Sequence, residues 1–173
     1  FMPQGPNLVG GATDGSLLIW DTQEGRLAGQ SPHGHTRPII DIALAPDRRN
    51  GVTLGADQQL RFWRMGPRPG LSTRFAVTPG AKAKGLALGG SSVAYADTEG
   101  AVSLAPLAGG SATVVHQHDQ QVWAVALSPD GSRIASADRS GRILISSTTS
   151  GGAQTSLPAV GEAVWSLDFS ADG

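Results

Sequence analysis

The chain has 173 residues, a formal net charge of −1 and only 16% charged residues. Its 24 glycines and 11 prolines suit many short strands joined by turns better than long helices. There is no apolar run of membrane-spanning length, no recognisable signal peptide and no cysteine. We therefore expect a soluble protein without disulfides, and its compartment is either the cytoplasm or the periplasm.

Along the chain, a short apolar strand after a turn recurs at a fixed spacing. The first copy is Ser16–Asp21, and the next three are Gln59–Arg64, Ala101–Ala105 and Arg142–Ser146. Successive copies start 41 to 43 residues apart. A period of about 40 to 45 residues is typical of β-propeller blades, each built of four short strands.

A second pattern has the same spacing. Apolar segments that end in a turn lie at Ile39–Asp47, Val122–Asp130 and Val164–Asp172, and a degenerate copy lies at Gly85–Gly90. The first two are 83 residues apart, which is about two periods, and the last two are 42 apart. Two patterns with one period indicate four repeated units.

The unit at residues 118–160 is the best preserved. Pro129 and Gly131 form a turn there, since proline presets φ and glycine accepts a positive φ, and no helix passes such a point. We expect its four strands at Val122–Leu127, Arg133–Ser136, Arg142–Ser147 and Gln154–Leu157. A single blade cannot bury both faces, so the units must stack.

From about residue 8 to the end, the sequence resembles the WD-repeat β-propellers. Gly34-His35 resembles the Gly-His opening of that family's repeat, and Trp20-Asp21 resembles its Trp-Asp close. The resemblance implies an all-β fold for residues 1–173, with four blades' worth of four-stranded sheets. The implied blades are residues 8–29 with 163–173, then 35–77, 85–116 and 118–160, where Ala163–Phe169 is the first strand of a unit.

Four blades are few for this family, which usually has seven or eight. The resemblance therefore implies part of a larger propeller, or a ring that a second copy completes in a homo-oligomer. The Ala- and Gly-rich repeats indicate bacterial WD repeats.

The resemblance also implies a buried hydrogen-bond network in each complete repeat. His35, Thr53, Asp57 and Trp63 match all four of its positions in the second unit. The fourth unit keeps His118 and Ser136 but has Ser140 and Ser146 in place of the Asp and the Trp, and the third has Glu99 and Ala105 and no histidine.

All four histidines form two His-x-His pairs, His33 with His35 and His116 with His118. Such pairs can bind zinc or copper. However, His35 and His118 each stand 12 residues before a Pro-Asp aspartate, which places them at one structural position in separate blades. We therefore expect a structural role, no metal and no cofactor.

Trp123 and Trp165 stand exactly one period of 42 residues apart, and Ile40 occupies the same repeat position in the second unit. By resemblance, this position lies at the start of the innermost strand, near the top face of a propeller. Aromatic residues there can anchor a protein or peptide partner, or pack between blades. Our candidates for partner binding are Trp123, Trp165, Ile40, Arg37, Arg61 and Arg142.

Charge and motifs complete the functional reading. Residues 37–84 hold nine basic and three acidic side chains. This excess of positive charge favours an acidic partner; the alternative interpretation is ordinary solvated loops. Because no aromatic residues are interleaved with the basic ones, we expect no nucleic-acid binding. The aspartates lie in turns, and neither a phosphate loop nor a nucleophile elbow occurs.

We therefore expect a protein-interaction scaffold that is not an enzyme, one module of a larger protein or complex. The alternatives are an enzyme with its site in the central channel, and the propeller module of a multidomain enzyme or a c-type cytochrome. A channel enzyme needs convergent polar residues on the inner strands, where this sequence has mostly Ala, Leu, Val and Trp.

Overall fold

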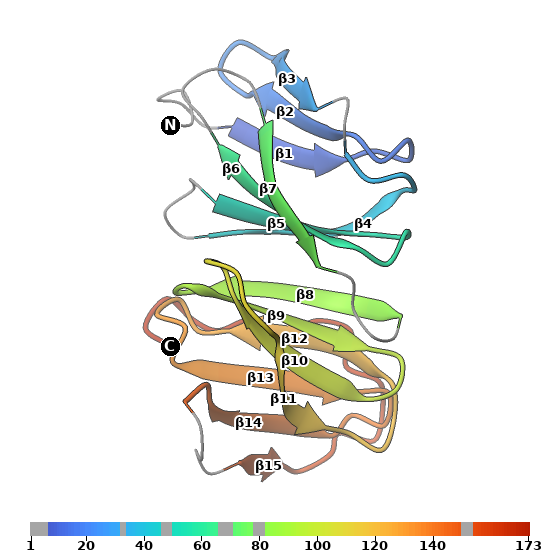
Figure 1. Ribbon diagram of the computed structural model, residues 1–173. Helices are drawn as coiled ribbons and strands as arrows, with labels where there is room; N and C mark the ends of the chain where they lie inside the picture. The colour runs from blue at the N-terminus through green and yellow to red at the C-terminus, as the bar shows by residue number, and fades with distance from the viewer. Residues whose placement is uncertain (1–6, 32–33, 46–49, 66–70, 78–81, 150–153) are drawn as a thin grey trace. The chain divides into compact units, whose positions relative to one another are not determined.

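A computed structural model describes residues 7–31, 34–45, 50–65, 71–77, 82–149 and 154–173, with the side chains of 65 and 71–77 left out (Figure 1). All regular elements of these residues are β-strands, and none is a helix. The described part therefore has no helix that could span a membrane. This confirms the all-β fold, which is consistent with a WD-repeat β-propeller. The chain divides into two compact units, Phe1–Pro79 and Gly80–Gly173.

The first unit holds two antiparallel sheets, one of three strands in the order β1-β2-β3 and one of four in the order β4-β5-β6-β7. Leu17, Ile19 and Trp63 form its buried apolar cluster, on which Ile39 and Ile42 pack. The strands are β1 (Asn7–Gly11), β2 (Leu17–Asp21), β3 (Arg26–Ser31), β4 (Ile39–Leu44), β5 (Asn50–Gly55), β6 (Leu60–Met65) and β7 (Leu71–Val77).

The second unit holds two four-stranded antiparallel sheets, in the orders β11-β10-β9-β8 and β12-β13-β14-β15. Strand β12 packs against β8 and β9 and so joins the two sheets. The strands are β8 (Ala83–Gly89), β9 (Ser92–Asp97), β10 (Ala101–Pro106), β11 (Thr113–Gln117), β12 (Val122–Leu127), β13 (Arg133–Asp138), β14 (Ile143–Ser147) and β15 (Thr155–Leu157).

The core of the second unit is made of small and β-branched side chains. Ala94, Ala96, Val102, Val122 and Ile134 have no exposed surface, and they belong to one apolar cluster. Such side chains suit the pleated surface of a sheet. At Gly89 a Cβ would lie 2.3 Å from the Ser128 carbonyl oxygen, so the close approach of the two sheets requires glycine there.

The turn that precedes β2, β6, β10 and β14 has the same backbone in every sheet. Gly15, Gly100 and Gly141 have φ values of +83°, +89° and +81°. In the β4–β7 sheet this position is Gln58, with φ of +63°, and it is the one non-glycine residue with positive φ in the described part of the chain. The left-handed conformation is therefore built into the repeat, even where the sequence lacks glycine.

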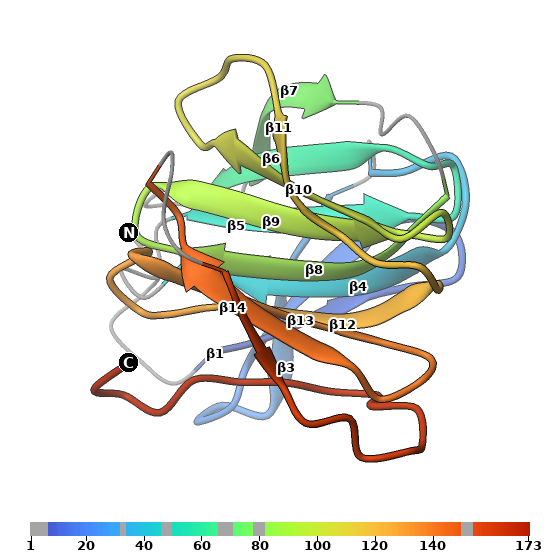
Figure 2. The same ribbon diagram turned by 90° about the horizontal axis from the view of Figure 1, so that it is seen from below.

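One expected strand is not formed. We expected Ala163–Phe169 to be the first strand of a unit, but residues 158–173 contain no strand, and Figure 2 draws this last part of the chain, in red, as a coil. A strand needs a hydrogen-bonded neighbour, and both sheets of the second unit already hold four strands. Its pairing with the blade at residues 8–29 stays a prediction.

Candidate interaction site and its buried networks

The β4–β7 sheet holds a network of four buried side chains. His35 Nδ1 lies 2.8 Å from Asp57 Oδ1, and His35 Nε2 lies 2.7 Å from Thr53 Oγ1. Trp63 donates its Nε1–H to the same Thr53 oxygen at 2.8 Å. Because Asp57 is an acceptor, His35 donates from Nδ1, and its Nε2 accepts the Thr53 hydroxyl. Every polar atom of the network then has a partner.

Gly55 makes room for this network. A Cβ at Gly55 would lie 2.3 Å from His35 Nδ1 and 2.4 Å from Asp57 Oδ1. Burial lowers the pKa of His35, and hydrogen bonding to Asp57 opposes this only in part. Burial would raise the pKa of Asp57, but its hydrogen bonds with the Thr36 backbone and His35 bring that pKa below its ordinary value.

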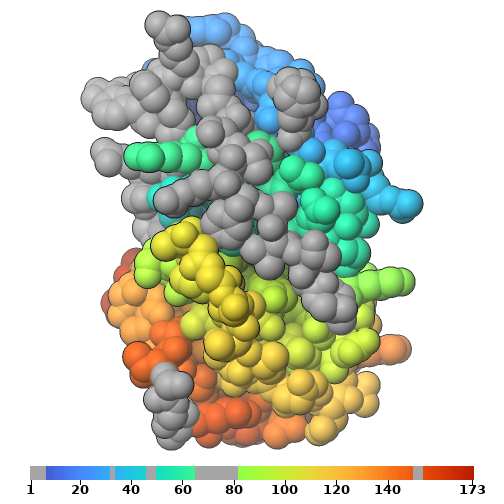
Figure 3. Space-filling model, viewed as in Figure 1, coloured from blue at the N-terminus to red at the C-terminus, as the bar shows by residue number. Residues whose placement is uncertain are grey.

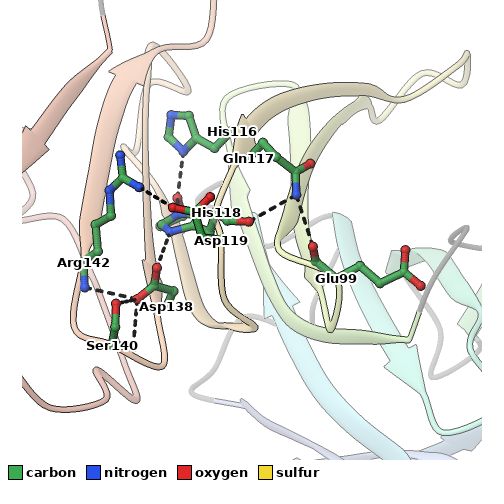
Figure 4. A network of polar contacts seen from close by, with 9 residues as sticks. Glu99, His116, Gln117, His118, Asp119, Asp138, Ser140 and Arg142 are labelled. Atoms are coloured by element: carbon green, nitrogen blue, oxygen red, sulfur yellow. Dashed lines mark hydrogen bonds and ion pairs between the residues drawn. The ribbon is translucent and has the colours of Figure 1, made fainter.

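The β12–β15 sheet holds a related but longer network, of which Figure 4 shows His116, His118 and Asp138. His118 Nδ1 lies 3.0 Å from Asp138 Oδ2, and His118 Nε2 lies 2.8 Å from Ser136 Oγ. The same Ser136 oxygen lies 2.7 Å from His116 Nδ1, and His116 Nε2 lies 2.8 Å from Ser146 Oγ. All five side chains are buried.

The acid of this network is Asp138, although Ser140 stands at the repeat position that Asp57 has in the other sheet. Spacing from Asp57 points to Ser140, 22 residues after the histidine, whereas Asp138 is 20 residues after it, at the end of β13. Asp138 occupies the place that Gly55 has in the other sheet, and from there its side chain reaches His118 directly. Ser140 instead donates to Asp138 Oδ1 at 2.6 Å.

Ser136, His118 and Asp138 have the connectivity of a serine hydrolase triad. However, Ser136 has no exposed surface, and its oxygen already contacts two imidazoles. A substrate therefore cannot reach this hydroxyl. Burial, together with repulsion from His118, lowers the pKa of His116 to about 4, so that His116 is neutral at pH 7. The arrangement supports the fold rather than a reaction.

Trp123 and Trp165 are in contact. Their ring centroids lie 4.1 Å apart with an interplanar angle of 74°, which is an edge-to-face arrangement. Trp165 is 70% exposed, and Trp123, on β12, is partly buried. The Nε1 atom of Trp123 is buried and makes no hydrogen bond. The pair thus offers a large aromatic surface held by a strand.

Charged side chains lie on the turns of the same unit. Arg142 Nη1 lies 3.2 Å from Asp119 Oδ2, and the Arg142 backbone N–H donates to Asp138 Oδ1 (Figure 4). The Asp119 side chain is 90% exposed, so this ion pair contributes little to stability. Gln117, at the end of β11, donates its side-chain N–H to the Glu99 carbonyl in the turn before β10.

Comparison with known proteins gives matches to WD repeats. Residues 109–145, which include the second histidine pair and strands β12 and β13, match the family described as WD domain, G-beta repeat. The comparisons support a WD-repeat family. This matched WD repeat contains His116, His118 and Asp138.

The chain matches short parts of much longer relatives. WD repeat-containing protein 3 of Homo sapiens is 33% identical over 63 residues, which are 36% of this chain and 7% of that protein. The uncharacterized WD repeat-containing protein C25H1.08c of Schizosaccharomyces pombe is 35% identical over 60 residues, which are 35% of this chain and 15% of that protein. These relatives are eukaryotic, so the bacterial character of the repeats is not confirmed.

The predicted site residues fall in two units. Trp123, Trp165 and Arg142 lie in the second, and the structure joins the two tryptophans. In the first unit, Ile40 and Arg37 are exposed, and Arg61 donates to Gln59. The described residues hold no group of three or more metal-ligating side chains, and His33 lies outside them.

Sequence reasoning missed two members of the β12–β15 network, Asp138 and His116. The spacing of the other WD repeat excluded Asp138, and His116 had been considered only as half of a metal-binding pair. A signal for both was present, because Ser146 leaves Ser136 without an indole donor and Ser140 leaves His118 without an acid. Nearby polar residues then had to fill both roles.

Proposed function

We propose that this chain is a protein-interaction module of a larger scaffold and that the Trp123–Trp165 pair anchors a protein or peptide partner. WD repeats generally serve protein binding, which agrees with the family that the comparisons support. The observation that carries the proposal is the 70% exposure of an indole that is already oriented by a second one. Tryptophan and arginine dominate binding hot spots, because they bury much area at a low entropic cost.

The buried and exposed atoms of the pair support this role. Trp123 is fixed on β12, whose neighbours Val122 and Ala124 are buried, so a partner would not have to order it. Burial of Trp165 against a partner would remove its large apolar surface from water. Arg142 and Asp119 form an ion pair on the turns of the same unit, and polar groups of this kind commonly surround the aromatic centre of an interface.

The first unit offers a second contact surface of different chemistry. Arg37 and Arg64 of this unit are exposed. Their charge favours acidic segments of a partner. Ile40 and Arg61 belong to this proposed surface, and binding to nucleic acid or membranes is not part of it.

The experiment is a comparative capture from source cells with quantitative mass spectrometry. The baits are the unaltered chain, Trp165→Ala and Val114→Ala. Val114 is the control because it is 61% exposed on β11, in the same unit but on the outer strand of another sheet. In the space-filling view of Figure 3, β11 and the loop that precedes it, both in yellow, lie on the surface. We expect proteins that Val114→Ala retains and Trp165→Ala loses; identical sets from all three baits contradict the proposal.

A further inference from the structure

The two buried networks differ at one position of the third strand. In the β4–β7 sheet this position is Trp63 on β6, whose indole donates to Thr53 Oγ1 at 2.8 Å and is almost completely buried. In the β12–β15 sheet it is Ser146 on β14, which is too short to reach the equivalent hydroxyl of Ser136 directly. Without a substitute, Ser136 would lack a donor and a cavity would remain.

His116 fills this position from another sheet. It lies on β11, where it pairs with Val102 of β10, and is therefore part of the β8–β11 sheet. Its Nδ1 contacts Ser136 at 2.7 Å, which matches the 2.8 Å contact of the Trp63 indole with Thr53. Its Nε2 contacts Ser146 at 2.8 Å, so the imidazole spans the space between the two serines.

We propose that His116 replaces the missing tryptophan and thereby locks the outer strand of the β8–β11 sheet to the buried network of the β12–β15 sheet. The Trp63 bond connects two strands of one sheet, whereas the His116 bonds connect two sheets. The substitution therefore changes the role of the network from holding one blade together to coupling two adjacent blades.

The direction of each hydrogen bond follows from the Asp138 carboxylate, which only accepts. His118 must donate from Nδ1, and the Nε2 of a neutral imidazole then accepts the Ser136 hydroxyl. Ser136 then accepts from His116 Nδ1–H, and His116 Nε2 accepts the Ser146 hydroxyl. With neutral imidazoles, this arrangement gives all five side chains a partner, and both rings carry their proton on Nδ1.

The test is a double-mutant comparison of His116→Ala, Ser146→Trp and the pair together. His116→Ala leaves a cavity, and Ser146→Trp places an indole where the imidazole already lies, so each single change should lower the melting temperature. In the double variant the indole occupies the vacated space and can donate to Ser136. We expect it to melt above both single variants; a double variant that melts below either one, or that does not fold, overturns the proposal.

A second experiment tests the coupling between the two sheets by measuring hydrogen exchange of backbone amides in His116→Ala. If His116 couples the sheets, backbone amides of β11 and of β14 should both exchange faster than in the unaltered chain. Val114→Ala, on the same strand but exposed, is the matched control and should change neither. Faster exchange confined to β11 would contradict a lock between sheets.

In the unaltered chain, nitrogen-15 NMR should show His116 with Nδ1 protonated and Nε2 unprotonated at pH 6; the opposite tautomer would overturn the assignment.

Discussion

Asp138 Oδ2 lies 3.0 Å from Nδ1 of His118, and both side chains are almost fully buried. The second carboxylate oxygen, Oδ1, accepts from the Ser140 backbone and hydroxyl and from the Arg142 backbone. One side chain thus fixes a histidine and closes the turn after β13. Asp97 binds the backbone of its own turn in the same way, through the amides of Glu99 and Ala101.

Replacement of Asp138 by Asn should be strongly destabilising. An amide has one acceptor oxygen, so it can serve either His118 or the turn but not both. The unsatisfied buried groups should lower the free energy of unfolding by about 2 to 4 kcal/mol, measured by urea denaturation.

Asp119→Asn is the matched control for that change. It is the same substitution in the same unit, but the Asp119 side chain is 90% exposed and forms an ion pair with Arg142 at the surface. Its loss should cost less than about 1 kcal/mol. Equal effects of the two substitutions would show that the buried network does not stabilise this sheet.

Asp57→Ala should destabilise the first unit by roughly 1 to 3 kcal/mol, because His35 and the Thr36 backbone lose their acceptor. Asp14 stands at the equivalent turn position of the β1–β3 sheet, but it accepts only from Ser16 in the contacts found. Asp14→Ala should therefore cost less. Thermal denaturation of the two variants tests this difference, and an unchanged melting temperature for Asp57→Ala would rule the network out as a source of stability.

The fold could be predicted from the sequence because it depends on repeated features. The apolar strands and the turns with positive φ recur with one period, and each leaves a local trace, as at Gly141 and Pro129. The network of His35, Thr53, Asp57 and Trp63 was implied by the resemblance to WD repeats, and its hydrogen bonds are present. These residues keep the spacing of the WD repeat.

The rest of the site could not be predicted, since it depends on contacts between positions that do not repeat. Asp138 reaches His118 from a strand end rather than from the turn, and spacing cannot show which way a carboxylate points. His116 acts across two sheets, so only their packing reveals its partners. For Ala163–Phe169, the apolar pattern predicts a strand but does not supply the neighbour that it needs.

Stability should fall as the pH falls from about 6.5 toward 4. The pKa of His116 in the folded chain is about 4, below its ordinary value of about 6.5, so on acidification the unfolded chain binds a proton that the folded chain does not. The pKa of His35 is lowered as well and acts in the same direction. For His116 alone, the loss between pH 7 and pH 5 should be on the order of 2 kcal/mol.

Urea midpoints at pH 7 and pH 5 measure this loss, and His116→Ala separates the contribution of His116. The variant should be less stable at pH 7 but should lose less stability on acidification. The ordinary pKa values of carboxylates lie below this range, and those of Asp57 and Asp138 are lowered further. An identical pH dependence of the variant and the unaltered chain would mean that His116 titrates normally.

Trp165→Ala and Trp123→Ala should differ in their effect on folding. Trp165 is 70% exposed, so its loss should cost less than about 1 kcal/mol, whereas the partly buried Trp123 should cost roughly 2 to 3 kcal/mol. Thermal denaturation followed by circular dichroism compares them. A large loss for Trp165→Ala would mean that this indole mainly stabilises the fold.

The affinity of a captured partner for Trp165→Ala tests the proposed function most directly. Isothermal titration calorimetry with the purified partner would compare this variant with the unaltered chain and with Val114→Ala. A hot-spot tryptophan is worth at least about 2 kcal/mol, so we predict that Trp165→Ala weakens binding by about 30-fold or more and that Val114→Ala changes it by less than about twofold. Equal affinity of Trp165→Ala and the unaltered chain would contradict binding through the Trp123–Trp165 pair.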